Sequence, residues 1–353
     1  MLDGLTLQRR QNPSRRLTLG SYAGGLAAGL VLSAALLLIA GVPPDSMVDD
    51  LFTQVFLDPG GLAQTVTLAI PLVLVGLSSA IAMSIRFWNI GMEGQLWLGA
   101  IGAAGCAIHD IGPAPLRLPL MLLAAAVAGA LWIAIPLVLR LRVSEMVVSL
   151  LLSNIAFLLL QHLLFGGWRD PANSFPVSPP FDPVEQLGLL GFGNVHTGLL
   201  VAVAAVAVTA VLVDRTRLGF QAAAIGLNPL AARAAGLPVA ATTIAMVLLS
   251  GALSGLAGGV IVAGTEHRLT QFIGMNATFS GIVIAFVARF KPAGVLVAAF
   301  AVAGIYNAGN TLKVFYALSD GIVVLIQSVV LMSLLVAQFF AAYRIDRVRG
   351  VTA

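Results

Sequence analysis

Long stretches without charge are the feature that most constrains how this chain can fold. A helix needs about 20 consecutive, mostly apolar residues to cross a bilayer. Ten stretches qualify, some of them short, and they are Tyr22–Val42, Leu62–Ile85, Phe87–Ile108, Leu118–Leu139, Met146–Phe165, Thr197–Val213, Ala240–Gly264, Ala277–Ala288, Pro292–Gly309 and Gly321–Tyr343. Charged residues make up only 10% of the chain, whereas soluble domains carry roughly 25%. The sequence therefore predicts an all-α integral membrane protein, with about ten transmembrane helices in a single domain over residues 1–353.

The distribution of Lys and Arg predicts the orientation of the chain in the membrane. If the N-terminus lies in the cytoplasm, 15 of the 19 basic residues fall in inner segments and four in outer ones, namely Arg117, Arg169, Arg268 and Lys313. Both termini, including residues 1–21, are then expected to be cytoplasmic. The basic residues occur singly or in pairs between apolar runs, which is not the pattern of a nucleic-acid-binding surface.

The outer segment 166–196 divides the predicted spans into two sets of five. It is rich in Pro, Asp and Gly, and we expect it to form a short capping element. With an odd number of spans in each half, an internal repeat would have to be inverted in topology. The sequence leaves this five-plus-five arrangement open. The eighth stretch, Ala277–Ala288, is too short to cross alone and is expected to be tilted or paired with a re-entrant segment.

The longest inner loop, residues 214–238, is expected to contain a short helix. Good helix formers occupy Ala222–Ile225 and Leu230–Ala235, and the four residues between them break the helical pattern. Asn228 is suited to cap the second stretch, and Pro229 is suited to its first turn. The sequence thus predicts a short cytoplasmic helix between two spans, shaped to press against a partner.

Motifs for catalysis or metal binding are missing from the sequence. It contains no G-x-x-x-x-G-K-[ST] phosphate-binding loop and no H-E-x-x-H motif. The four histidines are scattered, and the single cysteine, Cys106, rules out a Cys-based metal cluster. We therefore expect no catalytic residue, no metal and no cofactor. ATP hydrolysis, if it drives this protein, must take place on a separate chain.

Glu93 is the most informative polar residue within a span. If the third span is helical from Arg86, Glu93 lies about 10 Å inside the membrane boundary, where a carboxylate needs partners. Asn89 and Gln95 can supply donors, and the neighbouring glycines allow close approach of another backbone. Two interpretations stay open: these side chains shape the transport pathway or a moving hinge, or they lock a helix junction by hydrogen bonds.

Other polar and small residues within spans have the same two interpretations. Ser149, Ser153 and Asn154 lie close together on the fifth span, and Ser280 lies on the eighth. They either contact a polar solute or form hydrogen bonds between helices. The G-x-x-x-G pairs at Gly20–Gly24 and Gly251–Gly255 are expected to allow close helix packing within one subunit rather than dimerisation.

Four stretches of the chain together resemble a known family. The sequence F-W-N-I-G-M-E-G-Q-L from Phe87 resembles the F-N-I-G-x-E-G-Q signature of ABC importer permeases in the ribose and nucleoside branch. Val143–Asn154, Ala224–Gly236 and Phe279–Phe286 agree with further family stretches in the same order. Departures include Trp88, inserted before the Asn of the signature. The resemblance covers about residues 60–335 and is nearest to the longer permease of nucleoside importers, with simple-sugar importers close behind.

The resemblance implies a division of labour among several chains. Two permease subunits, here expected to be paralogues in a hetero-dimer, would form the pathway in a bacterial inner membrane, surrounded by lipid. Separate cytoplasmic ATPases would bind ATP, and an outer binding protein, either a lipoprotein or a periplasmic protein, would deliver the solute. That solute is expected to be a nucleoside or related small polar molecule, with a pentose as the alternative. A secondary carrier driven by ions is a third interpretation, which would predict a buried acid pair.

Two groups of candidate residues follow. The pathway and gating candidates are Asn89, Glu93, Gln95, Ser149, Ser153, Asn154 and Ser280. The candidates for coupling to the ATPase are Gly226, Asn228, Pro229, Ala231, Ala232, Arg233 and Gly236, the last of which is expected to end the short helix. The small residues of the coupling group are expected to let that helix sit closely in a groove on the partner.

Overall fold

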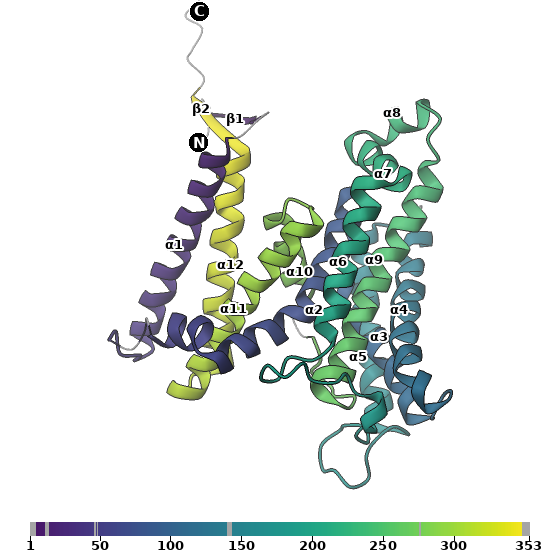
Figure 1. Ribbon diagram of the computed structural model, residues 1–353. Helices are drawn as coiled ribbons and strands as arrows, with labels where there is room; N and C mark the ends of the chain where they lie inside the picture. Colours follow the sequence, from purple (N-terminus) through teal and green to yellow (C-terminus); the bar gives the residue numbers. More distant parts are fainter. Residues whose placement is uncertain are drawn as a thin grey trace, which may run out of the picture. The chain divides into compact units, whose positions relative to one another are not determined.

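The computed structural model describes residues 5–10, 14–45, 47, 49–139, 143–274 and 277–347 (Figure 1). Its α-helices are α1 (Arg15–Ile39), α2 (Pro59–Ser84), α3 (Met92–Ile108), α4 (Ala114–Leu139), α5 (Glu145–Phe165), α6 (Gly198–Arg215), α7 (Arg217–Leu227), α8 (Pro229–Ala234), α9 (Val239–Ile261), α10 (Ala277–Val287), α11 (Pro292–Tyr316) and α12 (Asp320–Ala342). Shorter elements are the π-helices η1 (Asp49–Leu57) and η3 (Val262–Glu266) and the 3-10 helix η2 (Pro183–Glu185). The chain divides into two compact units, one made of Met1–Asp58 with Gly304–Ala353 and the other of Pro59–Ala303.

Eight of the ten predicted spans correspond to helices that are long and apolar enough to cross a membrane. The other two predicted spans are α10, which has 11 residues, and α3, which has 17. The short length of α10 was expected. The prediction that the third span is helical from Phe87 is wrong, because α2 ends at Ser84 and α3 begins only at Met92.

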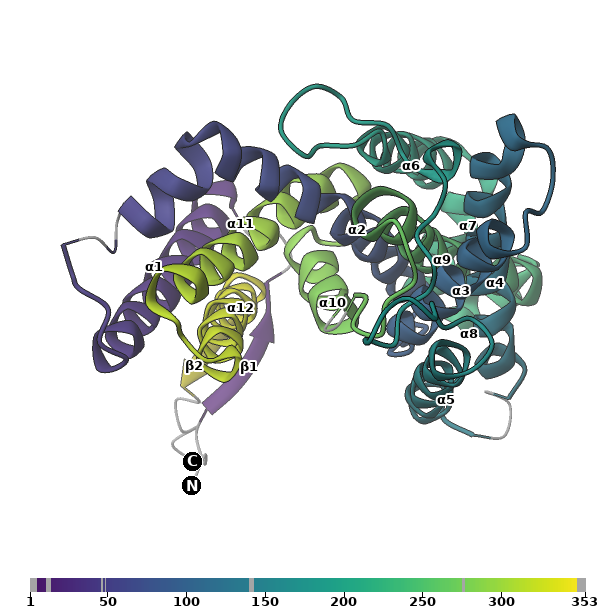
Figure 2. The same ribbon diagram turned by 90° about the horizontal axis from the view of Figure 1, so that it is seen from below.

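The first unit is built around α1 and α12, which lie side by side (Figures 1 and 2). A side chain at Gly25 would overlap Ala337, and one at Gly29 would overlap Ser333, so these two glycines allow the helices to approach closely. At one end of the pair is an apolar core of Leu37, Val42, Met47, Leu312, Leu318, Val323 and Ile326. The prediction of packing by the pair Gly20–Gly24 is wrong, because a Cβ at either position would meet no described atom within 4 Å.

Two short strands depart from the all-α prediction. Strand β1 (Leu5–Arg9) pairs antiparallel with β2 (Tyr343–Arg347), with Leu5 opposite Arg347 and Arg9 opposite Tyr343. Neither five-residue segment has a neighbour in the sequence with which to pair, so sequence periodicity could not reveal this ladder. The pairing brings the two terminal segments to the same end of the first unit.

The second unit packs α2, α3 and α4 around α9, and α5 and α6 lie on opposite sides of the α3–α9 pair (Figure 2). Glycines allow the backbones to touch: a Cβ at Gly129 of α4 would lie 2.7 Å from the Cα of Gly255 on α9. A side chain at Gly99 of α3 would overlap Gly255 from the other side. The predicted packing role of Gly251–Gly255 within one subunit is therefore confirmed.

Candidate functional site

The turn between α2 and α3 brings most of the predicted pathway residues together. Arg86 adopts a left-handed backbone conformation, with φ of 60°, and the chain turns away from α2 at this residue. Phe87, which is 1% exposed, then anchors the turn in the apolar interior. The side chain of Asn89 accepts a hydrogen bond from the backbone N–H of Gly91 at 3.2 Å, which supports the non-helical segment before Met92.

Asn89 and Gln95 form a reciprocal pair of buried amides. Asn89 Nδ2 donates to Gln95 Oε1 at 3.0 Å, and Gln95 Nε2 donates to Asn89 Oδ1 at 2.7 Å. Both residues are 1% exposed. A buried amide left without partners costs about 1–3 kcal/mol, and here each side chain satisfies the other. The pair therefore locks the start of α3 to the turn that precedes it.

Three serines extend this network to α2 and α9. Asn89 Nδ2 also donates to Ser250 Oγ at 3.1 Å, and Ser250 Oγ donates to the backbone oxygen of Ser78 at 2.9 Å. Ser254 Oγ donates to Ser78 Oγ at 3.1 Å. The sequence showed these serines only as parts of small-residue stretches. The spacing of Ser250 and Ser254 by one helical turn was the available signal, but their partner could not be read from it.

Glu93 and Thr278 cap each other's helices. The backbone N–H of Glu93 donates to Thr278 Oγ1 at 3.0 Å, and the backbone N–H of Thr278 donates to Glu93 Oε1 at 3.4 Å. Each residue lies in the first turn of its helix, where free N–H groups and the helix dipole favour an acceptor. Because α3 starts at Met92, the predicted depth of Glu93 along a helix from Arg86 is wrong. Its carboxylate nevertheless has the partners that its position requires.

Serines of α5 pack against the first turn of α3. The backbone N–H of Gly94 donates to Ser153 Oγ at 3.3 Å, and a Cβ at Gly91 would lie 2.7 Å from the carbonyl oxygen of Ser149. Both serines are buried. Asn154 differs, because it is exposed and donates to the carbonyl oxygen of Leu150 on its own helix at 3.1 Å.

The short helix predicted within residues 214–238 is present, and its end signals act as expected. Asn228 Oδ1 accepts hydrogen bonds from the backbone N–H groups of Leu230 and Ala231 at 3.0 and 3.1 Å. Pro229 is the first residue of α8, and Gly236 has a left-handed backbone with φ of 77°. The predicted break over four residues is wrong. Helix α7 runs on to Leu227, and Asn228 alone separates it from α8.

The exposed surface of this loop is more apolar than expected. Leu227 and Leu230 are 79% and 75% exposed, and Phe220 is 68% exposed. Ala232, in contrast, is buried within the chain, so its predicted contact with a partner is wrong. A contiguous exposed apolar patch is a candidate for an interaction surface. The small size of the alanines singled them out in the sequence, whereas nothing in the sequence distinguished Leu227 and Leu230.

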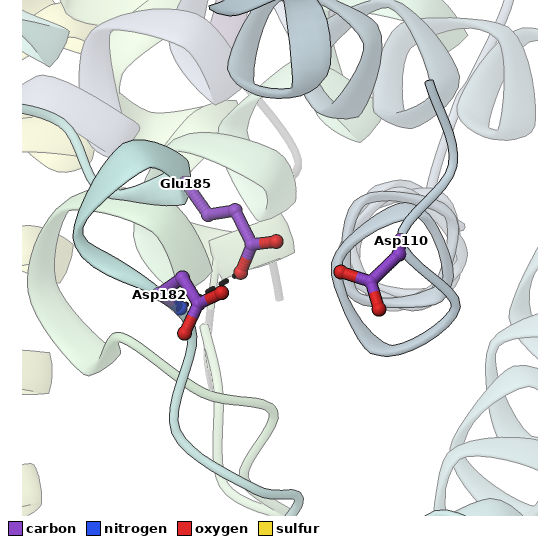
Figure 3. Close-up of side chains that lie close together, drawn as sticks. All are labelled: Asp110, Asp182 and Glu185. Carbon is purple, nitrogen blue, oxygen red and sulfur yellow. Dashed lines mark hydrogen bonds between the residues drawn. The ribbon is translucent and has the colours of Figure 1, made fainter. Parts of the chain in front are cut away.

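At the end of the second unit away from this loop lie three acidic side chains, Asp110, Asp182 and Glu185 (Figure 3). Arg117 of α4 joins two of these carboxylates. Its Nη1 lies 2.7 Å from Asp110 Oδ1 and 2.8 Å from Glu185 Oε1. Glu185 lies in η2, within the predicted capping element, and its Oε2 accepts from the backbone N–H of Asp182 at 2.8 Å. Oxygens of the three acids lie within 4.8 Å of one another, close enough for a metal ion. Arg117 already compensates two of these carboxylates, so we assign this cap cluster a structural role.

His196 lies at the same end of the second unit as the cap cluster. Its ring is buried against Gly198 and Gly264. Nδ1 accepts from the backbone N–H of Gly198 at 3.2 Å, and Nε2 lies 3.4 Å from Thr265 Oγ1. Burial, with a smaller effect of the nearby His267, lowers the pKa of His196 to about 4. The ring is therefore neutral at neutral pH, as its close packing requires.

Comparison with known proteins decides the family. Residues 61–337 match the family described as the branched-chain amino acid transport system / permease component. The chain belongs to this family. The permease is 34% identical to the glucose ABC transporter permease protein TsgB13 of Haloferax volcanii, over 97% of this chain and 93% of the relative. It is 31% identical to the guanosine ABC transporter permease protein NupP of Bacillus subtilis, over 80% and 81%. The nucleoside ABC transporter permease protein NupB of Lactococcus lactis is 30% identical, over 77% and 78%.

The resemblance to ABC importer permeases is thus confirmed. The permease is an all-helical multi-pass membrane component of an ABC importer, apart from its short terminal strands, and is not itself an enzyme. In its second unit, five of the seven predicted pathway residues gather where α3 begins, namely Asn89, Glu93, Gln95, Ser149 and Ser153. Ser280 is buried on α10, and Asn154 faces outward.

Proposed function

We propose that the permease forms the pathway for a nucleoside or a related small polar solute. The observation that carries this proposal is its likeness to guanosine and nucleoside permeases, at 31% and 30% identity over about four fifths of each chain. The test is uptake of labelled guanosine in cells that depend on this permease. Uptake that survives deletion of its gene, in a strain without other nucleoside carriers, would contradict the proposal.

A simple sugar is the second candidate, and a specific observation favours it. The glucose permease of Haloferax volcanii is similar over 97% of this chain. A ribose ring and a glucose ring both present neighbouring hydroxyl groups, so one polar pathway can suit either solute. A competition experiment distinguishes nucleoside import from sugar import. In a nucleoside importer, excess adenosine should abolish guanosine uptake and excess glucose should not. A sugar importer should show no guanosine uptake.

The proposed partners are an ATPase, a second permease and an outer binding protein. Two guanosine permease proteins of Bacillus subtilis, NupP and NupQ, are 31% and 25% identical to this chain, which supports a hetero-dimer of paralogues. A bacterial inner membrane remains our proposed location, although one relative comes from an archaeon. The binding protein would dock on the side of the outer segment 166–196.

We place the ATPase contact on α7 and α8. The capped helix α8, the exposed Leu227 and Leu230, and Arg233 form a rigid apolar surface with one positive charge. Gly226 and Asn228 of the coupling group act through the backbone. A side chain at Gly226 would overlap the carbonyl oxygen of Ser84, and Asn228 caps α8. Leu230→Glu should abolish co-purification of the ATPase without preventing membrane insertion. Leu230→Met, which keeps an apolar side chain at the same position, is the control and should retain the ATPase.

The gating role belongs, in our proposal, to the turn before α3. Its amide pair and serines are neutral hydrogen-bonding groups, which can exchange partners at less cost than an ion pair in a membrane. Ser280 and Asn154 stay candidates for contact with the solute. For topology we propose ten crossings with both termini inside. A cysteine at Asp214 should then react only with membrane-permeant reagents in intact cells, and one at Asp170 should react with impermeant reagents as well.

A further inference from the structure

The side chain of Arg86 binds the last two carbonyl groups of α7. Its Nε donates to the oxygen of Gly226 at 2.7 Å, and Nη2 donates to the oxygen of Leu227 at 2.8 Å. The final carbonyls of a helix have no donor within the helix, and a cation is favoured beside them. The planar guanidinium supplies two donors in a fixed geometry, which a lysine cannot match. We call this contact the Arg86 clamp.

The backbone at Arg86 indicates that its side chain is needed. The N–H of Phe87 donates to the oxygen of Ala82 at 3.0 Å, and the N–H of Arg86 donates to the oxygen of Met83 at 3.0 Å. This is the hydrogen-bond pattern that ends many helices, and the left-handed residue within it is usually glycine. Any other residue there adopts a less favourable backbone conformation. Arg86 accepts this cost, and its guanidinium holds the end of α7.

The end of α10 has a related turn with the same hydrogen bonds, in which Phe290 is left-handed as well, with φ of 60°, and its arginine does not make the same contact. Phe290 N–H donates to the oxygen of Ala285 at 2.9 Å, and Arg289 has φ of 53°. Both turns have the sequence I-A-x-x-x-R-F, at residues 81–87 and 284–290. Within the described part of the chain, however, only the first of these two arginines is bonded to α7. The pair of turns therefore separates the effect of the backbone from the effect of the clamp.

We propose that the Arg86 clamp transmits movement of the α7–α8 loop to the amide pair that locks α3. Arg86 is three residues before Asn89, and the backbone of Gly226 lies directly against Ser84 at the end of α2. A displacement of the end of α7 therefore pulls on the turn whose next residues form the Asn89–Gln95 pair. Arg86 is a positioning residue that connects ATPase docking to gating, and this inference rests on the proposed coupling function of the loop.

Arg86→Gly is the decisive variant, because glycine is favoured in the left-handed conformation. The turn should stay intact, so the assembled transporter should form, bind its ATPase and hydrolyse ATP. Guanosine transported per ATP hydrolysed should fall about tenfold, within the range by which residues between coupled sites alter coupling. Amide hydrogen exchange over residues 217–236 should become faster, because the end of α7 is released. Arg86→Lys keeps the charge without the two-pronged contact and should show a smaller fall.

Arg289→Gly is the matched control and should leave both measurements at wild-type values. The inference would be overturned if Arg86→Gly transported as much guanosine per ATP hydrolysed as the wild type and showed wild-type amide hydrogen exchange over residues 217–236. Equal effects in the two glycine variants would also overturn it, because the effect would then belong to the shared turn. If the wild-type permease fails to bind its ATPase, the proposed function fails instead, and the exchange measurement still decides whether the clamp exists. If glucose rather than guanosine is transported, the ratio is measured with labelled glucose.

Discussion

The two polar clusters of the second unit hold their helices together by different chemistry. At the start of α3, amides and hydroxyls of Asn89, Gln95 and Ser250 share hydrogen bonds, and the Glu93 side chain accepts from the backbone N–H of Thr278. At the other end, Arg117 bridges two carboxylates. Removing one partner of a buried ion pair leaves an uncompensated charge and costs about 3–5 kcal/mol, whereas hydrogen bonds between membrane helices average about 0.6 kcal/mol each.

The difference suggests different mobility. Weak neutral bonds can be exchanged as helices shift, so the cluster at α3 suits a part that moves. The cap cluster ties α4 to the outer segment through a buried carboxylate, and breaking one partner would leave the other charge unpaired. The cap cluster therefore suits the end of the second unit that stays fixed. In our proposal, the opposite end, with α7 and α8, responds to the ATPase.

Asn89→Leu should have the largest effect, because it strands the amide of Gln95 in the interior. We expect a loss of about 1–3 kcal/mol from the unpaired amide alone, with little folded protein recovered and no uptake. Thermal unfolding in detergent measures the loss. The double variant Asn89→Leu/Gln95→Leu should recover part of the stability, since neither amide remains, but not uptake. A double variant no more stable than the single one would contradict the reciprocal pair.

Arg117→Met should lower the melting temperature and leave transport by the surviving folded molecules near normal. The reason is that Glu185 remains buried without its cation. Arg117→Met/Glu185→Met should regain stability, because both charges are then removed. Transport per folded molecule in reconstituted vesicles is the measurement that sharpens the contrast. A fall in that rate in the double variant would show that the cap cluster also takes part in transport.

Acid should destabilise the cap through His196. Its pKa is about 4 in the folded protein, below the ordinary value near 6.5, so the unfolded chain binds the proton more readily. The stabilisation is present above about pH 6.5 and is lost as the pH falls towards 4. Between pH 7 and 5 we expect a loss of about 1–2 kcal/mol, seen as a lower melting temperature. His196→Gln should flatten this dependence, and an unchanged slope in that variant would assign the effect to other groups.

Glu93→Gln should have the smallest effect. The amide oxygen can still accept from the backbone N–H of Thr278, and the partner hydrogen bond from the backbone of residue 93 is unaffected. We expect near wild-type stability and uptake. Glu93→Leu removes the acceptor and should weaken both. If Glu93→Gln is as damaging as Glu93→Leu, the charge of Glu93 is itself required, and neutral hydrogen bonds alone do not hold the start of α3.

Local signals determined a large part of the protein. Apolar stretches located the eight long helices, because a span must consist almost wholly of apolar residues to be stable in lipid. Asn228 and Pro229 predicted the start of α8 correctly, since a cap acts on N–H groups only two or three residues away. The need of Glu93 for partners was also evident from its position in an apolar stretch. The family followed from short motifs in a fixed order.

Tertiary structure decided which distant groups meet. Glu93 and Thr278 are 185 residues apart, and Asn89 and Ser250 are 161 apart. The sequence predicts that a buried amide needs partners, but the packing of α9 against α2 and α3 determines which residues those partners are. The wrong prediction about Gly20–Gly24 has the same cause. Gly20–Gly24 and Gly251–Gly255 are identical as motifs, yet only the second faces another helix closely, because a motif specifies what can approach it and the fold specifies what does.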